Sequence, residues 1–271
     1  MQVQKPSRKL SPYEKTQLLR ARISEKTALS EPDKPVEYIT GKVDFFSHSF
    51  QVTQDTLIPR PESEELITKA LEWFEKNRAS FGKKPPVILD IGTGCGAIAI
   101  SLALELQKLR VEAEITATDI SAGAIAVAKQ NAVKHNVPTI TWVSADLLDF
   151  LPASAQVDLL IANLPYIPSE RIAYLDASVK DFEPKIALDG GSDGLHHIRK
   201  LLNEAHQYLT PIGTILLEVD YTHGETIRQE FNRTWQVQTW QSSISACTFA
   251  QFWPLTNNAH PAASQHPAQA K

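Results

Sequence analysis

From residue 86 to the end of the chain, short apolar runs alternate with longer stretches in which apolar residues recur at helical spacing. The short runs predict buried strands, and the longer stretches predict amphipathic helices. The predicted strands are 87–91, 113–118, 139–144, 157–162, 213–219, 235–241 and 248–254, and the predicted helices are 97–109, 122–135, 194–208 and 224–231.

Alternating strands and helices indicate an α/β fold with a mostly parallel sheet that helices cover on both faces. No helix is predicted between the last two strands, so we expect them to form a C-terminal antiparallel hairpin. The expected sheet has seven strands, one for each apolar run.

The first 60 residues show different patterns. Residues 11–30 predict one amphipathic helix, with Ser11 as the N-cap, Pro12 at the first helical position and Glu14 completing a capping box. Residues 37–53 alternate as short strands around Gly41 and predict a hairpin. A further helix is predicted over residues 62–78, after the break at Pro59–Pro61.

These patterns divide the chain into four parts. We expect a short N-terminal helical segment (1–36), a hairpin linker (37–60), the main α/β domain (61–255) and a disordered, Ala/Pro-rich tail (256–271). A chain of 271 residues is long enough for one large domain and a small appendage.

Charge and cysteine content narrow the function classes. The net charge of −4 argues against a general nucleic-acid binder, and a solvated helix face explains the basic residues among the first thirty. The two cysteines, Cys95 and Cys247, lack metal-ligand spacing, which indicates a reducing compartment and no metal site. No apolar run reaches the ~18 residues of a membrane span, so we expect a cytoplasmic protein.

A glycine-rich turn follows the strand at 87–91 and opens the next helix, in the order Asp90-Ile91-Gly92-Thr93-Gly94-Cys95-Gly96-Ala97. Glycines let a backbone approach a ligand closely, and a helix N-terminus favours negative groups. This suits a phosphate or the carboxylate of an amino-acid-like cofactor. Alone, the turn is weak evidence, and Cys95 is expected to contribute backbone rather than a nucleophile.

Asp119 ends the second strand of the repeat, and Asp146 follows the third. At these positions Asp119 could accept hydrogen bonds from ribose hydroxyls, and Asp146 from an adenine amino group. Each residue alone is more typical of a turn or helix cap. Their recurrence at successive strand ends, together with the glycine turn, favours a nucleoside-containing cofactor.

Two such cofactors remain open. Gly92, Gly94 and Ala97 also fit the dinucleotide fingerprint of NAD enzymes. However, Asp90 would face a pyrophosphate badly, and Asp119 lies farther along the chain than that fingerprint expects. S-adenosylmethionine carries a cationic ammonium group and no phosphate, so we favour it.

The stretch Asn163-Leu164-Pro165-Tyr166 follows the strand at 157–162, where α/β sheets bind ligands. Asn163 offers a carbonyl to an N–H donor, Tyr166 offers a ring face, and Pro165 restrains the backbone of Leu164. Such a corner can hold a planar NH2 group, although a simple Asn-Pro turn explains it equally well. Glu218 and Asp220 could border this site or form a strand-end turn, whereas His196, His197 and His206 are expected to be surface or packing residues.

The combined order of motifs resembles the class I methyltransferases, and more narrowly the HemK-like protein-(glutamine) methyltransferases that modify peptide chain release factors. The segments that carry the resemblance are Asp90–Gly96, Asp119, Asp146, Asn163–Tyr166, Leu57–Glu62, Glu37–Gly41, Phe182–Pro184 and Ala187–Gly194. The resemblance implies a Rossmann-like fold, S-adenosylmethionine as cofactor and the glutamine of a Gly-Gly-Gln motif as target.

The resemblance also implies residue roles. Gly92, Thr93, Gly94, Cys95 and Gly96 would cradle the methionine part of the cofactor, beside Asn163. Asp119 would bind the ribose, while Asp146 and Leu147 would bind the adenine edge. Asn163, Pro165 and Tyr166 are the expected catalytic residues; with Leu164 they would hold the glutamine amide, and Arg60 and Glu62 would shape the pocket.

The chain departs from the family pattern at Leu164, where the family usually has proline, and in the short segment before Glu37, which implies a reduced substrate-docking region. Adenine-N6 methylation of rRNA or DNA remains an alternative, because adenine also presents a planar NH2 group. An NAD-dependent oxidoreductase and a cofactor-binding module without catalysis are weaker alternatives.

Overall fold

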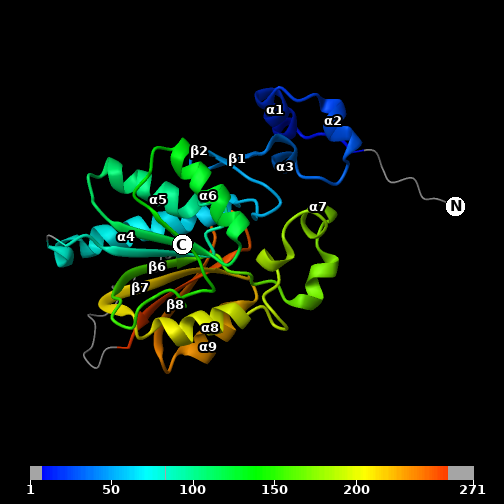
Figure 1. The fold of residues 1–271 in the computed structure, drawn as a ribbon. Helices are drawn as coiled ribbons and strands as arrows, with labels where there is room; N and C mark the ends of the chain where they lie inside the picture. The colour runs from blue at the N-terminus through cyan, green and yellow to red at the C-terminus, as the bar shows by residue number, and fades with distance from the viewer. Residues whose placement is uncertain (1–7, 83, 256–271) are drawn as a thin grey trace, which may run out of the picture.

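The computed structural model describes residues 8–82 and 84–255, so the predicted tail at 256–271 lies outside the described residues. Its main body is a seven-stranded sheet with the order β5-β4-β3-β6-β7-β9-β8 (Figure 1). The first five strands of that order pair in parallel, and β9 pairs antiparallel with both β7 and β8. The predicted α/β fold with a C-terminal antiparallel hairpin is therefore confirmed.

Element bounds agree with the predicted ranges to within four residues, the largest difference being the start of β7. The strands of the large sheet are β3 (Val87–Ile91), β4 (Glu114–Asp119), β5 (Thr141–Ser144), β6 (Val157–Ala162), β7 (Leu209–Val219), β8 (Trp235–Gln241) and β9 (Thr248–Pro254). The helices around it are α4 (Glu64–Phe81), α5 (Ala97–Lys108), α6 (Ala122–Lys134), α8 (His196–Ala205) and α9 (His223–Phe231). Short helical turns η2 (Ser169–Tyr174), α7 (Ala177–Lys180) and η3 (Lys185–Ala187) lie between β6 and α8.

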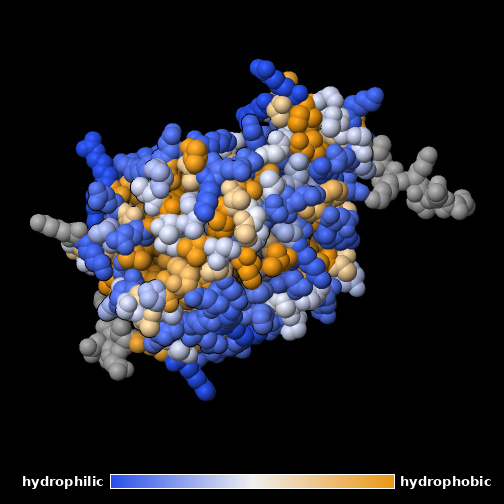
Figure 2. Space-filling model, viewed as in Figure 1, coloured by the Kyte–Doolittle hydropathy of each residue, from blue (hydrophilic) through white to orange (hydrophobic). Residues whose placement is uncertain are grey.

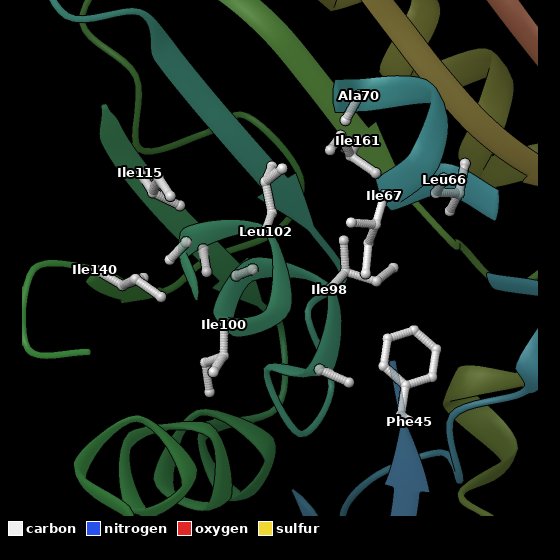
Figure 3. Close-up of a cluster of buried hydrophobic side chains, with 14 of the residues drawn as sticks. Phe45, Leu66, Ile67, Ala70, Ile98, Ile100, Leu102, Ile115, Ile140 and Ile161 are labelled. Atoms are coloured by element: carbon white, nitrogen blue, oxygen red, sulfur yellow. The ribbon is translucent and has the colours of Figure 1, made fainter. Parts of the chain in front are cut away.

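Helices cover both faces of the sheet. Successive residues of a central strand point to opposite faces, so both sets of side chains are buried against helices. In β6, Leu159 and Ile161 pack into one core cluster with α4 and α5, whereas Leu160 and Ala162 pack into the other with α8 and α9. Figure 3 shows Ile161 beside Ile67 and Ala70 of α4 in the first cluster.

The register of the parallel strands determines where the candidate residues meet. Ile91 of β3 lies opposite Thr118 of β4 on one side and opposite Ala162 of β6 on the other. The residues that follow, Gly92, Asp119 and Asn163, are therefore brought to the same carboxyl edge of the sheet, as the sequence predicts.

The single helix predicted for residues 11–30 is wrong. The structure has two helices, α1 (Pro12–Ala21) and α2 (Glu25–Ser30), separated at Arg22, whose φ of 57° lies in the left-handed region. A second capping residue explains the break, because the Ser24 side chain accepts a hydrogen bond from the Thr27 backbone and begins a new helix. The predicted capping box at Ser11 and Glu14 is confirmed.

The predicted hairpin exists, but its position was wrong. Val36–Thr40 forms helix α3, and Gly41, with φ of 70°, is its C-cap rather than the turn of the hairpin. The strands are β1 (Lys42–Phe45) and β2 (His48–Gln51), joined through Phe46 and Ser47. A glycine in the left-handed conformation ends helices as readily as it forms turns, which the alternating pattern alone does not distinguish.

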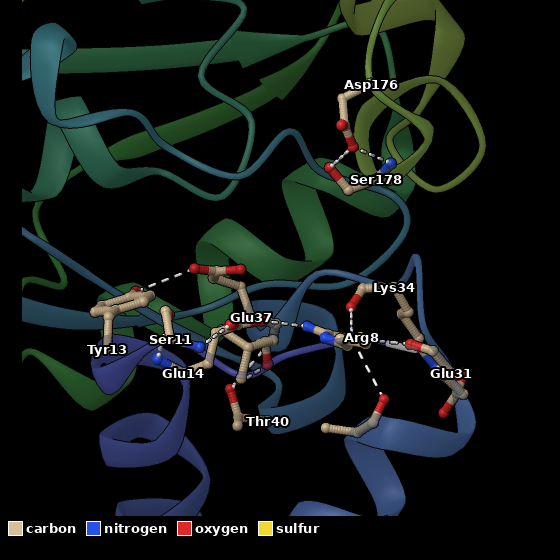
Figure 4. A network of polar contacts seen from close by, with 12 residues as sticks. Arg8, Ser11, Tyr13, Glu14, Glu31, Lys34, Glu37, Thr40, Asp176 and Ser178 are labelled. Carbon is tan, nitrogen blue, oxygen red and sulfur yellow. Dashed lines mark hydrogen bonds and ion pairs between the residues drawn. The ribbon is translucent and has the colours of Figure 1, made fainter. Parts of the chain in front are cut away.

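The N-terminal helices are held together by Arg8, whose guanidinium points inward (Figure 4). It donates to the carbonyls of Glu31 (2.8 Å) and Lys34 (2.7 Å) and forms an ion pair with Glu14. Arg20 in turn pairs with Asp44 of β1 at 2.9 Å. Lys15 also pairs with Glu25 at 3.7 Å, so at least three of the basic residues among the first thirty make intramolecular contacts.

On the face shown in Figure 2, hydrophilic residues surround separate hydrophobic patches. Across residues 8–82 and 84–255, none of the helices combines the length and the apolar character needed to cross a membrane.

Candidate functional site

A pocket with a volume of about 170 Å³ opens at the carboxyl edge of the sheet. The pocket is lined by the loops that follow β3, β4, β5 and β6, together with the segment before α4 and the turns before α8. Of the predicted site residues, the lining contains Gly92, Thr93, Gly94, Cys95, Asp119, Asp146, Leu147, Asn163, Leu164 and Pro165. The structure therefore brings ten of the predicted positions to one cavity, whereas Gly96 and Tyr166, like Arg60 and Glu62, are not among its lining residues.

The glycine turn has the backbone geometry that the sequence predicts. Gly92 has φ of 73°, and a Cβ there would lie 3.2 Å from Leu164 Cδ2. Gly96 has φ of 83°, and a Cβ there would lie 3.0 Å from both Ile100 and Trp142. Gly92 therefore allows close approach to the loop after β6, and Gly96 allows close packing of the start of α5.

Asn131 of α6 supports this turn from behind and was missed by the sequence analysis. Its Nδ2 donates to the Cys95 carbonyl (2.9 Å), and its side chain bonds the Gln51 backbone through both amide atoms. The buried Asn131 thereby links the glycine turn to strand β2. Burial raises the pKa of the Cys95 thiol to about 12, which leaves it protonated near neutral pH.

Asp90 does not line the pocket, so its proposed meeting with a cofactor ammonium group finds no support. The residue is 2% exposed, and its Oδ2 accepts from the Thr93 hydroxyl (2.6 Å) and from the Ala99 backbone N–H (3.2 Å). Burial raises the pKa of Asp90 to about 7. Asp90 therefore anchors the start of α5, a role that spacing in the sequence does not distinguish from ligand contact.

Asp119 lies at the end of β4 and faces the glycine turn. Its carboxylate accepts from the backbone N–H groups of Gly94 and Ser121, both at 2.9 Å. Burial raises the pKa of this carboxyl above its ordinary value. A carboxylate has lone pairs beyond those two bonds, so Asp119 can also accept from vicinal hydroxyls in the pocket.

Asp146 and Leu147 form the wall beyond β5. The Asp146 carboxylate pairs with Lys200 of α8 at 2.6 Å. Leu147 is buried and has φ of 47°, a left-handed conformation that costs a non-glycine residue of this size free energy. Lys200 gave no signal in the sequence beyond its place on a predicted helix.

Asn163 has a defined amide orientation. Its Nδ2 donates to the Ser63 hydroxyl oxygen at 3.0 Å, and the Ser63 hydroxyl donates to Glu218 at 2.5 Å. Ser63 and Asn163 both line the pocket. Ser63 takes one N–H of this amide, so the Asn163 carbonyl oxygen is free to accept a hydrogen bond from a ligand and a second N–H is left to donate.

The Tyr166 hydroxyl donates to the second oxygen of Glu218 at 2.9 Å. Burial, together with the neighbouring Glu218 carboxylate, raises the pKa of Tyr166 well above its ordinary value. Glu218 therefore borders the site, since this 2% exposed carboxylate belongs to the hydrogen-bond network that holds Asn163. Asp220, by contrast, pairs with Arg171 at 2.9 Å.

Arg60 supports the pocket indirectly. It forms an ion pair with Glu183, whose other oxygen accepts from the Ile58 backbone N–H at 3.1 Å. Pro59 and Pro184, the neighbours of these residues, line the pocket, whereas Arg60 and Glu62 do not.

One histidine prediction needs correction. His197 lines the pocket, although its helix was expected to carry only surface or packing histidines. It lies in the first turn of α8, directly beside the pocket edge. His196 is exposed, and His206 is exposed beside the Trp235 ring, at 5.3 Å between ring centroids.

The charge of the lining favours one of the two candidate cofactors. Three aspartates contribute to it, Asp55, Asp119 and Asp146, whereas lysine and arginine are absent from the described lining residues. An acidic pocket attracts a cationic sulfonium and ammonium, and it repels a pyrophosphate. With the glycine turn and the accepting carboxylate of Asp119, these residues fit S-adenosylmethionine better than NAD.

Comparisons with known proteins agree with this geometry. Residues 88–181 match a family described as "Methyltransferase domain". Among solved structures, the N-terminal domain of human METTL16 in complex with SAH has a TM-score of 0.54 at 17% identity, covering 78% of this chain and 77% of that one. The ribosomal protein L11 methylase of Lactobacillus delbrueckii subsp. bulgaricus has a TM-score of 0.51 at 19% identity, covering 75% of this chain and 83% of that one. These structures show a shared fold.

Curated relatives are closer in sequence. The release factor glutamine methyltransferase of Nitratidesulfovibrio vulgaris is 37% identical over 77% of this chain and 67% of its own length. Its counterparts in Enterococcus faecalis and Koribacter versatilis are each 34% identical, covering 76% and 79% of this chain and 70% and 72% of their own lengths. With this degree of identity and coverage, the chain belongs to the family of release factor glutamine methyltransferases.

Proposed function

We propose that this protein transfers a methyl group from S-adenosylmethionine to the side-chain amide nitrogen of the glutamine in the Gly-Gly-Gln motif of peptide chain release factors. The observation that carries the proposal is the orientation of Asn163, which donates one N–H to Ser63 and leaves its carbonyl oxygen to accept from a ligand N–H. The names of the curated relatives support a release-factor glutamine as the target.

In this proposal Gly92, Thr93, Gly94 and Cys95 hold the methionine part of the cofactor, with Gly96 shaping the turn behind them. Asp119 accepts from the ribose hydroxyls, and Asp146 with Leu147 binds the adenine edge. When bound, S-adenosylmethionine supplies an electrophilic methyl group on a sulfonium.

Asn163 and Leu164 act on the acceptor. An amide nitrogen is a poor nucleophile because its lone pair is delocalised into the carbonyl. The Asn163 side-chain oxygen and the Leu164 backbone carbonyl accept its two N–H bonds, which fixes the nitrogen in line for attack and favours the positive charge that develops on it. Such positioning can contribute on the order of 7–11 kcal/mol to the barrier reduction, and the proton can leave after transfer.

Pro165 and Tyr166 complete the acceptor corner. Pro165 restrains the backbone that carries the Leu164 carbonyl. The Tyr166 ring packs against the amide plane while Glu218 holds its hydroxyl. In this proposal residues 61–255 form the catalytic domain, residues 1–36 form a reduced docking region for the release factor, and residues 37–60 link the two. The enzyme acts in the cytoplasm without binding nucleic acid.

Mass spectrometry of a release factor incubated with the enzyme and S-adenosylmethionine tests the proposal. The expected result is one added methyl mass on the peptide that contains Gly-Gly-Gln, and none when that glutamine is replaced by alanine. Labelled cofactor is supplied in parallel with purified rRNA and DNA. Methyl transfer to adenine with an unmodified release factor would reject the protein target.

A further inference from the structure

A buried carboxylate, Glu218, holds side chains that line or border the pocket. It lies at the carboxyl end of β7 and is 2% exposed. One of its oxygens accepts from the Ser63 hydroxyl (2.5 Å) and the other from the Tyr166 hydroxyl (2.9 Å). Ser63 belongs to the short 3-10 helix η1 (Pro61–Ser63) before α4, so the network joins three segments that are remote in the sequence.

The chemistry of this network determines which way the Asn163 amide faces. Burial raises the pKa of Glu218, but the two hydroxyls that donate to it oppose this shift and favour the ionised form. An ionised carboxylate only accepts hydrogen bonds, so the single proton of Ser63 is directed toward Glu218. The Ser63 oxygen then has only lone pairs to offer Asn163, and it pairs with the NH2 group at 3.0 Å. The opposite amide orientation would place two acceptor oxygens together without a proton between them, at the cost of a buried unsatisfied bond.

We propose that Ser63 and Glu218 are positioning residues that set the hydrogen-bond polarity of Asn163 and thereby make the pocket selective for an NH2-bearing acceptor. The inference rests on the proposed function, which assigns the Asn163 carbonyl to the substrate amide. It adds a specificity: a glutamine side chain satisfies the exposed carbonyl, whereas the carboxylate of glutamate presents an acceptor to an acceptor and is excluded.

Paired substitutions at each residue separate polarity from packing. Ser63→Ala removes the acceptor for the Asn163 NH2, while Ser63→Thr keeps a hydroxyl. Glu218→Met fills a similar volume but accepts nothing, which frees the Ser63 proton to bond the Asn163 oxygen and invert the amide. Glu218→Gln still accepts from Ser63 through its carbonyl and can donate to the Tyr166 oxygen.

We expect Ser63→Ala and Glu218→Met to lower kcat for the release-factor substrate at least tenfold, with the dissociation constant of S-adenosylmethionine unchanged within about threefold. Ser63→Thr and Glu218→Gln should stay within about fivefold of the wild-type kcat. Because both residues act through one chain of bonds, the double variant Ser63→Ala/Glu218→Met should be no slower than the slower single variant.

Ser101→Ala is the matched control. Ser101 is a buried serine of α5 whose hydroxyl has no hydrogen-bond partner among the described residues, so its loss should leave kcat and cofactor affinity unchanged. Thermal unfolding of every variant reports whether the fold is retained.

A spectroscopic readout does not depend on methyl transfer. In 15N-labelled protein, the side-chain NH2 signal of Asn163, assigned by its loss in Asn163→Ala, should be protected from solvent exchange in the wild type and in Glu218→Gln. It should exchange freely in Ser63→Ala. Protection that persists in Ser63→Ala, with wild-type kcat, would overturn the inference. A protected signal in an enzyme that leaves release factor unmethylated would support the polarity and reject the proposed substrate.

Discussion

Arg60 and Glu183 form an ion pair although 123 positions separate them in the sequence. The Glu183 side chain is 1% exposed, whereas that of Arg60 is 35% exposed. The pair joins the segment before α4 to the loop after α7, and residues beside both partners line the pocket. The sequence shows only the order of the motifs Leu57–Glu62 and Phe182–Pro184 along the chain. In the structure this ion pair joins them into one unit.

Removing the arginine should destabilise the protein strongly. In Arg60→Ala, the Glu183 carboxylate stays buried without its cation, which is expected to lower the free energy of unfolding by about 3 kcal/mol. Urea denaturation measures the change. Arg78→Ala is the control, because its exposed pair with Glu75 should contribute no more than about 0.5 kcal/mol. Equal losses of unfolding free energy in the two variants would show that the Arg60–Glu183 pair stabilises the protein no more than an exposed ion pair does.

Replacing the amide of Asn163 should remove turnover without removing the cofactor. Asn163→Ala takes away one of the two acceptors proposed for the substrate N–H bonds, so we expect kcat to fall at least ~100-fold. The dissociation constant of S-adenosylmethionine, measured by calorimetry, should change by less than about threefold. Near-wild-type turnover in this variant would contradict the assigned role.

Adding a methyl group at Gly96 should disturb the glycine turn more than the same change at Gly41. Both residues have positive φ, so each substitution carries backbone strain of about 1–2 kcal/mol. At Gly96 the new Cβ also meets Ile100, Trp142 and Ala128 at 3.0–3.1 Å, whereas at Gly41 nothing lies within 4 Å. Gly96→Ala should therefore lose a further ~1–3 kcal/mol of stability and bind cofactor more weakly. Identical unfolding midpoints for the two variants would contradict this.

Stability should depend on pH through Asp90. Burial raises its pKa from the ordinary 3.8 to about 7, so between these values the unfolded chain has released a proton that the folded protein retains. The unfolded state binds fewer protons there, and the contribution of Asp90 to stability falls as pH rises from about 4 to 7. In Asp90→Asn this dependence is lost. The unfolding free energy of Asp90→Asn relative to that of the wild type should rise as the pH increases across that range. Above about pH 8 this difference should stay constant.

Local sequence patterns predicted most of the fold because the elements after residue 86 carry strong, regular periodicity. The bounds of β3, β6, β8 and β9 agree with the predicted ranges to the residue. The errors lie before residue 54, where the Ser24 cap and the Gly41 C-cap redirected short segments whose periodicity is weak. There, local capping decided the structure where apolar spacing was ambiguous.

The meeting of Gly92, Asp119 and Asn163 follows from the sequence pattern, because each residue ends or follows a parallel strand and such strands end at one edge of the sheet. The sequence pattern did not show which neighbours hold the residues of the pocket. The contacts of Asn163 with Ser63, Asp146 with Lys200 and Cys95 with Asn131 span 100, 54 and 36 positions. Side-chain directions across such separations depend on how helices pack on the sheet, which periodicity leaves open. Tertiary structure alone therefore brought His197 to the pocket and oriented the amide of Asn163.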